Sequence, residues 1–413
     1  LAKEYDVPII LDPVGCHAGA YRLSVVLDLI KTGSISLLRG NQSEVKAVYD
    51  ALSSDNKDEI SPLGKGVDGA QVADSAIIAY RLARLINCPI VATGEEDYVS
   101  DGTRVFAVPH GHSIMTAVTG TGCLLGAVLA AFFGIYDSFK DSLSTGEFLA
   151  YALAYYGLAG ESAVKVSGIK PGSFSVAFMD ALYTLDDEVL VSENRVQSVV
   201  VPDQLQVYFV CGTQDTELNK KRLLEIVEDA CRGGITCFQF REKGDGTLEG
   251  QQKLELAQQL QHICAKYHVL YIVNDDVELA VAVNADGVHV GQDDMCLEDV
   301  RNIVGHKVVG ISIHSIEELH KTDVLYADCV GVGPMYTTSS KPDAQEPCGP
   351  ERTAELQAEG LTLPCVGIGG ITIDNAMAVL RAGACGVAVI SAIAHAEKPY
   401  EAVRQFKELA SSL

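Results

Sequence analysis

The second half of the chain alternates eight short apolar runs with amphipathic helical stretches, and this repeat limits its fold more than any other feature. The runs are 207–210, 236–241, 270–273, 287–290, 308–313, 329–332, 365–368 and 386–390. Between them, apolar residues recur at helical spacing, for example in 223–231, 254–267 and 375–382. Eight βα units in about 200 residues predict a (β/α)8 barrel, the TIM barrel.

Polar side chains gather where these strands end, which is where barrels of this kind carry their chemistry. Gln239, Arg241 and Lys243 follow one another at every second position, so they share one face of the second run. Two unpaired cations on a buried face would cost on the order of several kcal/mol. We therefore expect an anionic ligand here, and a polyphosphate fits best.

Asp275 and Asp294 end neighbouring runs, so both carboxylates could reach one ion. Hard oxygen ligands beside a phosphate substrate favour Mg2+. The alternative is structural, with Asp276 capping a helix and residues 291–294 forming a turn.

Other candidates at the same end of the barrel also have two interpretations. Lys341, in the small polar loop 337–341, suits a mobile cation that closes over phosphate, or is a solvated loop lysine. Gly369 and Gly370, with Ser391 after the last run, either bind a monophosphate through backbone N–H groups or form a tight turn. Asn274, Ser312 and His314 complete the polar set.

Composition excludes several classes of function. The 413 residues, 48% apolar and 21% charged, are ordinary for a compact protein of two or three domains. A formal charge of -24 argues against nucleic acid or an anionic membrane as partner. Twelve cysteines without zinc spacing, and the lack of a signal peptide or a membrane-spanning apolar stretch, predict a cytoplasmic protein with small-molecule substrates.

The first 190 or so residues predict a separate α/β layer domain, with strands at 7–11, 35–38 and 90–92. Its chemistry centres on the Gly-rich run 119–123 before the apolar helix 124–133, because N–H groups at a helix start attract phosphate. Asn41 and Glu44 stand three apart at another helix start, where they either cap the helix or bind magnesium through water.

From about residue 206 onward the chain resembles thiamine phosphate synthase. The matching segments are Gln239–Lys243, Asn274–Val277, Ala285–Asp294, Gly310–Ser312 with His314, Gly331–Tyr336 through Lys341, Gly367–Thr372 and Val389–Ser391. The resemblance implies a TIM barrel that uses Mg2+. It also implies the substrates, hydroxymethylpyrimidine diphosphate and hydroxyethylthiazole phosphate, and the products, thiamine phosphate and pyrophosphate.

The resemblance also implies a role for each residue. Arg241, Lys243 and Lys341 supply fixed positive charge, Asn274 donates a hydrogen bond, and Asp275 and Asp294 hold Mg2+. Gln239 and Ser312 match contacts to the pyrimidine substrate. The contacts to the thiazole phosphate match Thr338, Ser340, Gly370, Ile390 and Ser391.

The first domain resembles hydroxyethylthiazole kinase, of the ribokinase-like fold, which uses ATP and Mg2+. The matching segments are Leu11–Gly15, Leu38–Asn41 with Glu44, Lys65–Asp68, Val91–Glu95 and Val118–Leu124. By this resemblance Arg39 and Thr93 contact ATP and Gly120 contacts substrate. Cys123 takes the catalytic position where related sugar kinases carry Asp, unless it is a buried, inert thiol. Asp12 and Glu44 are candidates for positioning Mg2+.

The predicted organisation is a kinase-like domain at 1–191, a linker at 192–206 and a synthase barrel at 207–413. The kinase family has roughly a further third of a domain before the position of Leu1, so we expect an N-terminally incomplete kinase domain. Three functions stay open: a bifunctional enzyme, a synthase with an inactive kinase remnant of structural or regulatory role, and a thiazole tautomerase-like barrel. A homo-oligomer is possible, because the kinase family is usually trimeric.

Overall fold

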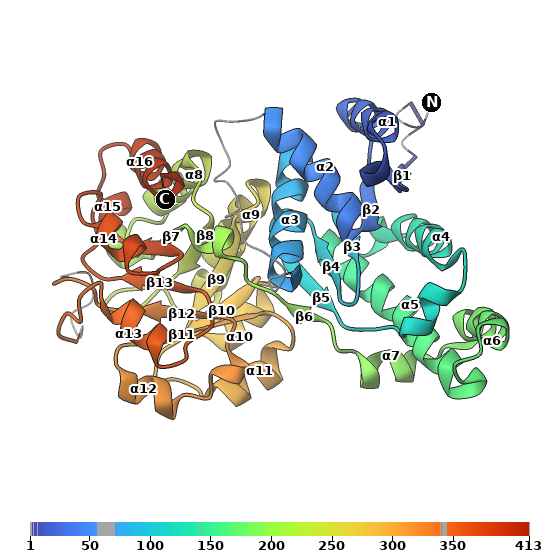
Figure 1. Cartoon of the computed structure of the whole chain (residues 1–413). Helices are drawn as coiled ribbons and strands as arrows, with labels where there is room; N and C mark the ends of the chain where they lie inside the picture. Colours follow the sequence, from blue (N-terminus) through green and yellow to red (C-terminus); the bar gives the residue numbers. More distant parts are fainter. Residues whose placement is uncertain are drawn as a thin grey trace. The chain divides into compact units, whose positions relative to one another are not determined.

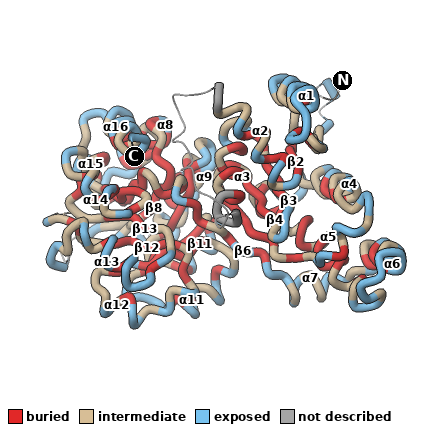
Figure 2. Tube along the Cα trace, in the orientation of Figure 1, coloured by how far each residue is buried: buried red, intermediate tan, exposed pale blue. Residues whose placement is uncertain are grey.

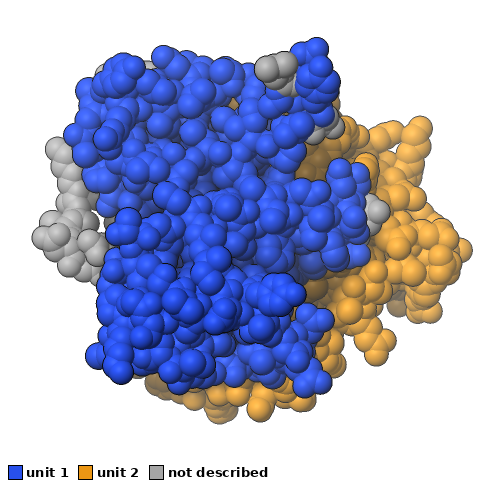
Figure 3. Space-filling view, turned by 90° about the vertical axis from the view of Figure 1, so that its right-hand side faces the viewer, with its two compact units in different colours: residues 1–60, 64–199 blue, residues 61–63, 200–413 orange. Residues whose placement is uncertain are grey.

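The computed structural model describes residues 2, 4–5, 7–55, 71–140, 142–338, 340 and 345–412 (Figure 1). Two compact units divide this chain, one ending at Val199 and the other beginning at Val200 (Figure 3). Each is described by itself. Lys341 of the predicted site and the kinase-like segment Lys65–Asp68 lie outside the described residues.

A six-stranded mixed sheet forms the centre of the first unit, in the order β1-β2-β3-β4-β5-β6. β1 to β3 are parallel, and β3 to β6 pair antiparallel. The strands are β1 Ile10–Leu11, β2 Leu37–Asn41, β3 Ile90–Thr93, β4 Asp97–Ser100, β5 Val105–Val108 and β6 Gln197–Ser198. The run 7–11 is thus a strand only at its end, the run 35–38 begins and ends later than expected, and β4 to β6 were not expected.

Helices cover both faces of this sheet, with α2 and α3 on one side and α4 and α5 on the other (Figure 1). Their bounds are α1 Ala20–Lys31, α2 Gln42–Asp55, α3 Gln71–Ile86, α4 Thr121–Phe133, α5 Thr145–Ser167, α6 Pro171–Thr184 and α7 Asp187–Glu193. Short 3-10 helices are η1 Cys16–Ala18, η2 Ser113–Ala117 and η3 Tyr136–Ser138. α5 is buried along much of its length, because its small residues let the helix pack closely on β4 and β5.

The second unit is a closed barrel of eight parallel strands, which confirms the predicted fold. β14 pairs with β7 and closes the ring. The strands are β7 Val207–Cys211, β8 Cys237–Phe240, β9 Leu270–Asn274, β10 Gly287–Val290, β11 Val308–Ile313, β12 Cys329–Val332, β13 Cys365–Ile368 and β14 Gly386–Val389. Each lies within a residue of the expected bounds at either end.

Two apolar layers hold the barrel together, because successive strand residues point inward and outward by turns. Phe238 and Val273 belong to the outer layer, under the helices, while Tyr208, Ile272 and Val366 belong to the inner one. Figure 2 shows the buried strands encircled by half-exposed helices. These are α8 Lys220–Gly233, α9 Gly250–Lys266, α10 Val277–Ala282, α11 Leu297–Val304, α12 Ile316–Lys321, α13 Arg352–Ala358, α14 Ala376–Arg381, α15 Ser391–Ala394 and α16 Pro399–Ser411, with 3-10 helices η4 Pro202–Leu205, η5 Thr213–Thr216 and η6 Val324–Tyr326.

The segment 192–206, expected as a linker, carries contacts at both of its ends. Strand β6 within it pairs with β5 of the first sheet. Val200 and Leu205 belong to the inner apolar layer of the barrel. No helix in the described part of the chain is both long and apolar enough to cross a membrane.

Candidate active sites

A cavity of about 390 Å3 is lined by side chains from the ends of the barrel strands and the loops that follow them. Fourteen of the residues expected at this end of the barrel line it: Gln239, Arg241, Lys243, Asn274, Asp275, Asp294, Ser312, His314, Thr338, Ser340, Gly369, Gly370, Ile390 and Ser391. Residues separated by up to 152 positions are therefore brought to one place, as the barrel predicts. The role of each residue stays a prediction.

Cationic and acidic groups meet on one side of this cavity. Lys243 Nζ donates to Asp275 Oδ2 at 2.8 Å. This hydrogen bond raises the pKa of Lys243. Deeper in the barrel, Gln239 Nε2 donates to the hydroxyl oxygen of Tyr208 at 2.8 Å. This side of the cavity thus offers a cation to an anionic ligand, and the neutral Gln239 and Tyr208 side chains lie below it.

The Asp275 and Asp294 carboxyl groups are close enough to affect each other. Burial raises the pKa of Asp275, the Lys243 hydrogen bond opposes that rise, and the Asp294 carboxyl adds to it. Both structural alternatives also occur: Asp276 Oδ1 accepts from Leu279 N at 3.0 Å and caps α10, and Asp294 Oδ2 accepts from Gly291 N at 2.8 Å. Capping by Asp276 leaves the Asp275 carboxylate available.

A pair of carboxylates that repel one another fits a bound cation, and oxygen donors suit Mg2+. No group of three or more His, Cys, Asp or Glu side chains suited to a metal occurs among the described residues. Two protein ligands are enough for Mg2+, which usually keeps waters and substrate oxygens in its shell. These carboxylates therefore fit the expected ion.

His289 also lines the cavity, although the sequence did not single it out. Its Nε2 lies 3.0 Å from Ser312 Oγ, and Nδ1 has no hydrogen-bond partner within the described structure. Burial lowers the pKa of His289 to about 4, so the ring is neutral. One sequence feature could have identified His289 as a cavity residue. It stands two residues after Gly287 in the run 287–290, so both residues lie on the inward face of this strand.

Two glycines make room for this ring. A Cβ at Gly310 would lie 2.3 Å from His289 Nδ1, and one at Gly331 would lie 3.2 Å from Cε1. Both glycines are on strands that follow β10 around the barrel. The inward face here is therefore shaped around the imidazole.

A turn of two glycines and hydroxyl-bearing residues line the opposite side of the cavity. Gly369 and Gly370 have φ of 95° and 63°, so they form the tight turn that was one of the two expectations. A Cβ at Gly370 would lie 2.5 Å from the carbonyl oxygen of Thr337. The turn therefore packs closely against the loop after β12. Thr338 and Ser340 of that loop line the same cavity. The turn interpretation does not exclude phosphate binding, because its glycines still line the cavity.

In the first unit, the ends of β1, β2 and β3 meet the start of α4. Arg39 NH1 donates to Asp12 Oδ2 at 2.9 Å, and Arg39 NH2 lies 3.4 Å from Thr93 Oγ1. A Cβ at Gly122 would lie 3.3 Å from Arg39 NH2, so the guanidinium lies against the first turn of α4. Gly120, with φ of 99°, precedes that turn. Arg39, Thr93 and the Gly-rich turn are thus assembled as one site.

Two buried polar atoms in this site lack a partner among the described residues, Asp12 Oδ1 and Arg39 Nε. Burial raises the pKa of Asp12, more than the neighbouring Arg39 lowers it. Buried polar atoms are normally hydrogen-bonded, so unsatisfied ones point to a bound polar group. The site fits a phosphate and its cation.

Cys123 is exposed, which contradicts the alternative of a buried, inert thiol. Asn41 and Glu44 form a cap: Glu44 N donates to Asn41 Oδ1 at 2.9 Å, and Glu44 Oε2 accepts from Asn41 N at 2.8 Å. The other oxygen accepts from Gly15 N at 2.7 Å. The capping interpretation is therefore confirmed for this pair.

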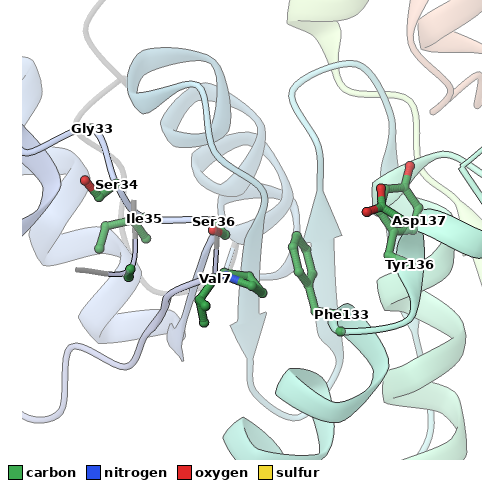
Figure 4. Close-up of a pocket in the computed structure, with 11 residues that line it drawn as sticks. Val7, Gly33, Ser34, Ile35, Ser36, Phe133, Tyr136 and Asp137 are labelled. Atoms are coloured by element: carbon green, nitrogen blue, oxygen red, sulfur yellow. The ribbon is translucent and has the colours of Figure 1, made fainter. Parts of the chain in front are cut away.

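A separate cavity of about 460 Å3 lies in the first unit. Figure 4 shows Val7 and Ser36, which precede β1 and β2, on one side and Phe133 on the other. Val7 and Ser36 lie before the starts of β1 and β2, whereas Asp12 follows the end of β1 and Arg39 lies within β2. None of the predicted site residues lines this cavity.

Comparison with known proteins gives both halves a family. Residues 1–188 match the hydroxyethylthiazole kinase family, and residues 207–393 match the thiamine monophosphate synthase family. The thiamine biosynthesis bifunctional protein ThiM/ThiE of Symbiobacterium thermophilum is 35% identical over 411 residues, covering 98% of this chain and 81% of that protein. The chain belongs to this bifunctional family.

Further relatives match the barrel half. The thiamine-phosphate synthase of Geobacillus thermodenitrificans is 50% identical over 205 residues, which are 50% of this chain and 91% of that protein. A solved thiamine phosphate pyrophosphorylase from Pyrococcus furiosus is 31% identical, covers 51% of this chain and 98% of its own, and superposes with a TM-score of 0.46.

Family membership therefore confirms the main prediction. The bifunctional protein is a thiamine phosphate synthase fused to a hydroxyethylthiazole kinase, and both activities are transfers. Membership of this family does not favour the alternative of a thiazole tautomerase-like barrel. The two families act on small molecules and imply use of ATP and typically Mg2+.

Proposed function

We propose that the barrel joins hydroxymethylpyrimidine diphosphate to hydroxyethylthiazole phosphate, forming thiamine phosphate and pyrophosphate. One observation carries this proposal: a single cavity has cations and paired carboxylates on one side and a glycine turn with hydroxyl groups on the other. The first side suits a diphosphate, and the second suits a monophosphate.

In the proposed reaction, the bond between the pyrimidine methylene carbon and the diphosphate oxygen breaks, and the thiazole nitrogen then forms the new bond with that carbon. Arg241 and Lys243 stabilise the charge on the departing pyrophosphate, and Asn274 donates to it. Asp275 and Asp294 would hold Mg2+, which when bound neutralises diphosphate charge. The nitrogen lone pair needs no general base. Lys341, outside the described residues, is proposed as a third cation.

Gln239 and Ser312 would orient the pyrimidine ring. Their positions support this role, because Gln239 bonds to Tyr208 and Ser312 to His289, so both side chains are held in place. Thr338, Ser340, Gly370, Ile390 and Ser391 would hold the thiazole phosphate. An aligned pair of substrates lowers the entropic part of the barrier.

For the first unit, we propose transfer of the ATP γ-phosphoryl group to the thiazole alcohol. Arg39 and Thr93 would contact ATP, the turn at Gly120 would contact substrate, and Cys123 would lie beside the alcohol. The unsatisfied Asp12 oxygen at this site supports a cation there. The product of this step is the second substrate of the barrel.

A two-arm assay tests both proposals. The chain receives the pyrimidine diphosphate and Mg2+ with either thiazole phosphate or thiazole alcohol plus ATP, and thiamine phosphate is quantified. Product in both arms is expected. Product from the phosphate arm alone would instead favour the inactive kinase remnant, and product in neither would contradict both proposals.

Variants then assign the residues. Arg241→Ala should lower the rate in both arms about 100-fold or more, as expected when a fixed donor to developing charge is removed. Arg39→Ala should abolish only the ATP arm. Arg232→Ala is a matched control, because this arginine pairs with Asp229 on an exposed helix surface and should leave both arms unchanged.

A further inference from the structure

Glu242 lies between the two proposed cations but is not among the residues that line the cavity. Its carboxylate accepts hydrogen bonds from Thr213 N at 2.8 Å and from Leu248 N at 2.9 Å. The Thr213 hydroxyl donates to it as well. One side chain therefore connects the loop after β7 with both ends of the loop after β8.

The end of β7 and the loop after it also form hydrogen bonds with the backbone of Arg241. Arg241 N donates to the carbonyl oxygen of Cys211 at 3.0 Å, and Gln214 Nε2 donates to the carbonyl oxygen of Arg241 at 2.7 Å. Asp215 Oδ2 accepts from Gln214 Nε2 at 2.8 Å and fixes its direction. A Cβ at Gly212 would lie 1.9 Å from the Arg241 carbonyl oxygen, so this close approach requires glycine.

The segment that is held in this way carries repelling charges. Arg241 and Lys243 are both cationic and stand two residues apart, and Lys243 Nζ is also held by Asp275 Oδ2 at 2.8 Å. Beyond Lys243, Gly244 and Gly246 are exposed and have φ of 123° and 77°, in the left-handed region that favours glycine. Groups that stabilise a departing anion work best when they are already in position.

We propose that Glu242 is a positioning residue of the synthase, which holds Arg241 and Lys243 in place for the diphosphate through Thr213 and Leu248. This inference rests on the proposed function of the barrel. Glu242 touches no substrate; it acts through the loop that presents the two cations. Its effect should fall on the diphosphate and spare the thiazole phosphate, which is proposed to bind across the cavity.

Glu242→Gln tests this inference, because an amide has one acceptor oxygen. With that oxygen at the Oε1 position, facing the Thr213 hydroxyl and Leu248 N, the amide NH2 group would meet the donor Thr213 N. Titration calorimetry of the full chain with inorganic pyrophosphate and Mg2+ should show about 10-fold weaker binding. The KM for the pyrimidine diphosphate should rise similarly, while the KM for the thiazole phosphate stays within about twofold. Thr213→Val should weaken pyrophosphate binding in the same direction, and the double variant should be little worse than Glu242→Gln.

Asp328→Asn is the matched control. Asp328 Oδ2 accepts from Val309 N at 2.8 Å and from Arg301 at 2.7 Å, and it precedes β12, at the end of the barrel away from the cavity. This variant should lower the melting temperature without changing pyrophosphate binding. The proposal is overturned if Glu242→Gln and Thr213→Val also lower only the melting temperature.

The synthase proposal can be contradicted independently of the Glu242 proposal. Wild-type chain that binds pyrophosphate without forming thiamine phosphate would contradict the synthase proposal, and the binding comparison would still decide the role of Glu242. Wild-type chain that binds no pyrophosphate would overturn both.

Discussion

Acidification from pH 7.5 to pH 5 should destabilise the barrel through one side chain, His289. Its ring is buried, and its pKa is lowered from 6.5 to about 4 because burial disfavours the imidazolium. Below about pH 6.5 His289 binds a proton in the unfolded chain, whereas in the folded barrel it stays neutral down to about pH 4. Stability is therefore complete above pH 6.5 and is lost as the pH falls.

The size of the loss follows from the two pKa values. At pH 5 the unfolded histidine is about 1.5 pH units below its pKa, whereas the folded one is still mostly neutral. Each unit corresponds to about 1.36 kcal/mol, so the free energy of unfolding falls by about 2 kcal/mol. For a domain of ordinary stability this is a large fraction of the total.

Methionine oxidation can measure this change in the barrel alone. The chain has no Trp, but Met335 is 1% exposed within the outer apolar layer of the barrel. Peroxide should oxidise it only when the barrel unfolds, so its oxidation across a urea series, followed by peptide mass, gives the free energy of unfolding at each pH.

His289→Gln is the decisive comparison, because other groups titrate equally in both proteins. The variant should lose about 2 kcal/mol less than wild type between pH 7.5 and pH 5, whatever its stability at pH 7.5. Ser312→Ala, which removes the neighbour of Nε2 but keeps the ring, should retain the wild-type slope. Equal slopes in wild type and His289→Gln would refute the reasoning.

Three further predictions follow from packing and charge. Gly310→Ala should destabilise the barrel by about 1–3 kcal/mol, measured by the same Met335 oxidation, because its Cβ would meet His289 Nδ1 at 2.3 Å; an unchanged urea midpoint would contradict this. Burial raises the pKa of Asp97 to about 7, so the folded first unit keeps a proton that the unfolded chain releases, and its stability should fall as pH rises from about 4 to 7. Asp97→Asn should remove that fall in hydrogen exchange of β4 peptides, and a persisting slope would show another group responsible. Cys123→Ala should lower product in the ATP arm and leave the phosphate arm unchanged; a loss in both arms would contradict the separation of the two sites.

The barrel could be predicted from the sequence because parallel strands buried on both faces are nearly continuous apolar runs, such as Val207–Cys211. The first sheet was harder to predict. β2 contains Arg39, which pairs with Asp12, the residue after β1. These two residues are 27 positions apart, so no local sequence pattern predicts the pair. β4 to β6 are short and antiparallel, and β6 comes almost ninety residues after β5.

The residues of the candidate site were likewise only partly predictable from the sequence. Arg241 and Asp275 are recognisable because charge at a strand end is unusual, and the barrel brings such ends together. Glu242 gave no such signal, since its partner Thr213 is 29 positions away and bonds through its backbone N–H as well as its hydroxyl. His289 looked like an ordinary strand residue until its neighbours Gly310 and Gly331 were seen to surround it.

The space for His289 comes from glycines on two other strands, and this arrangement limits the order in which the barrel can change in evolution. A larger residue at Gly310 would collide with the ring, so it becomes acceptable only after His289 has been replaced by something smaller. A smaller residue at 289 would in turn leave a void that glycine cannot fill. Substitutions at these three positions should therefore be strongly epistatic, with the single steps disfavoured in both directions.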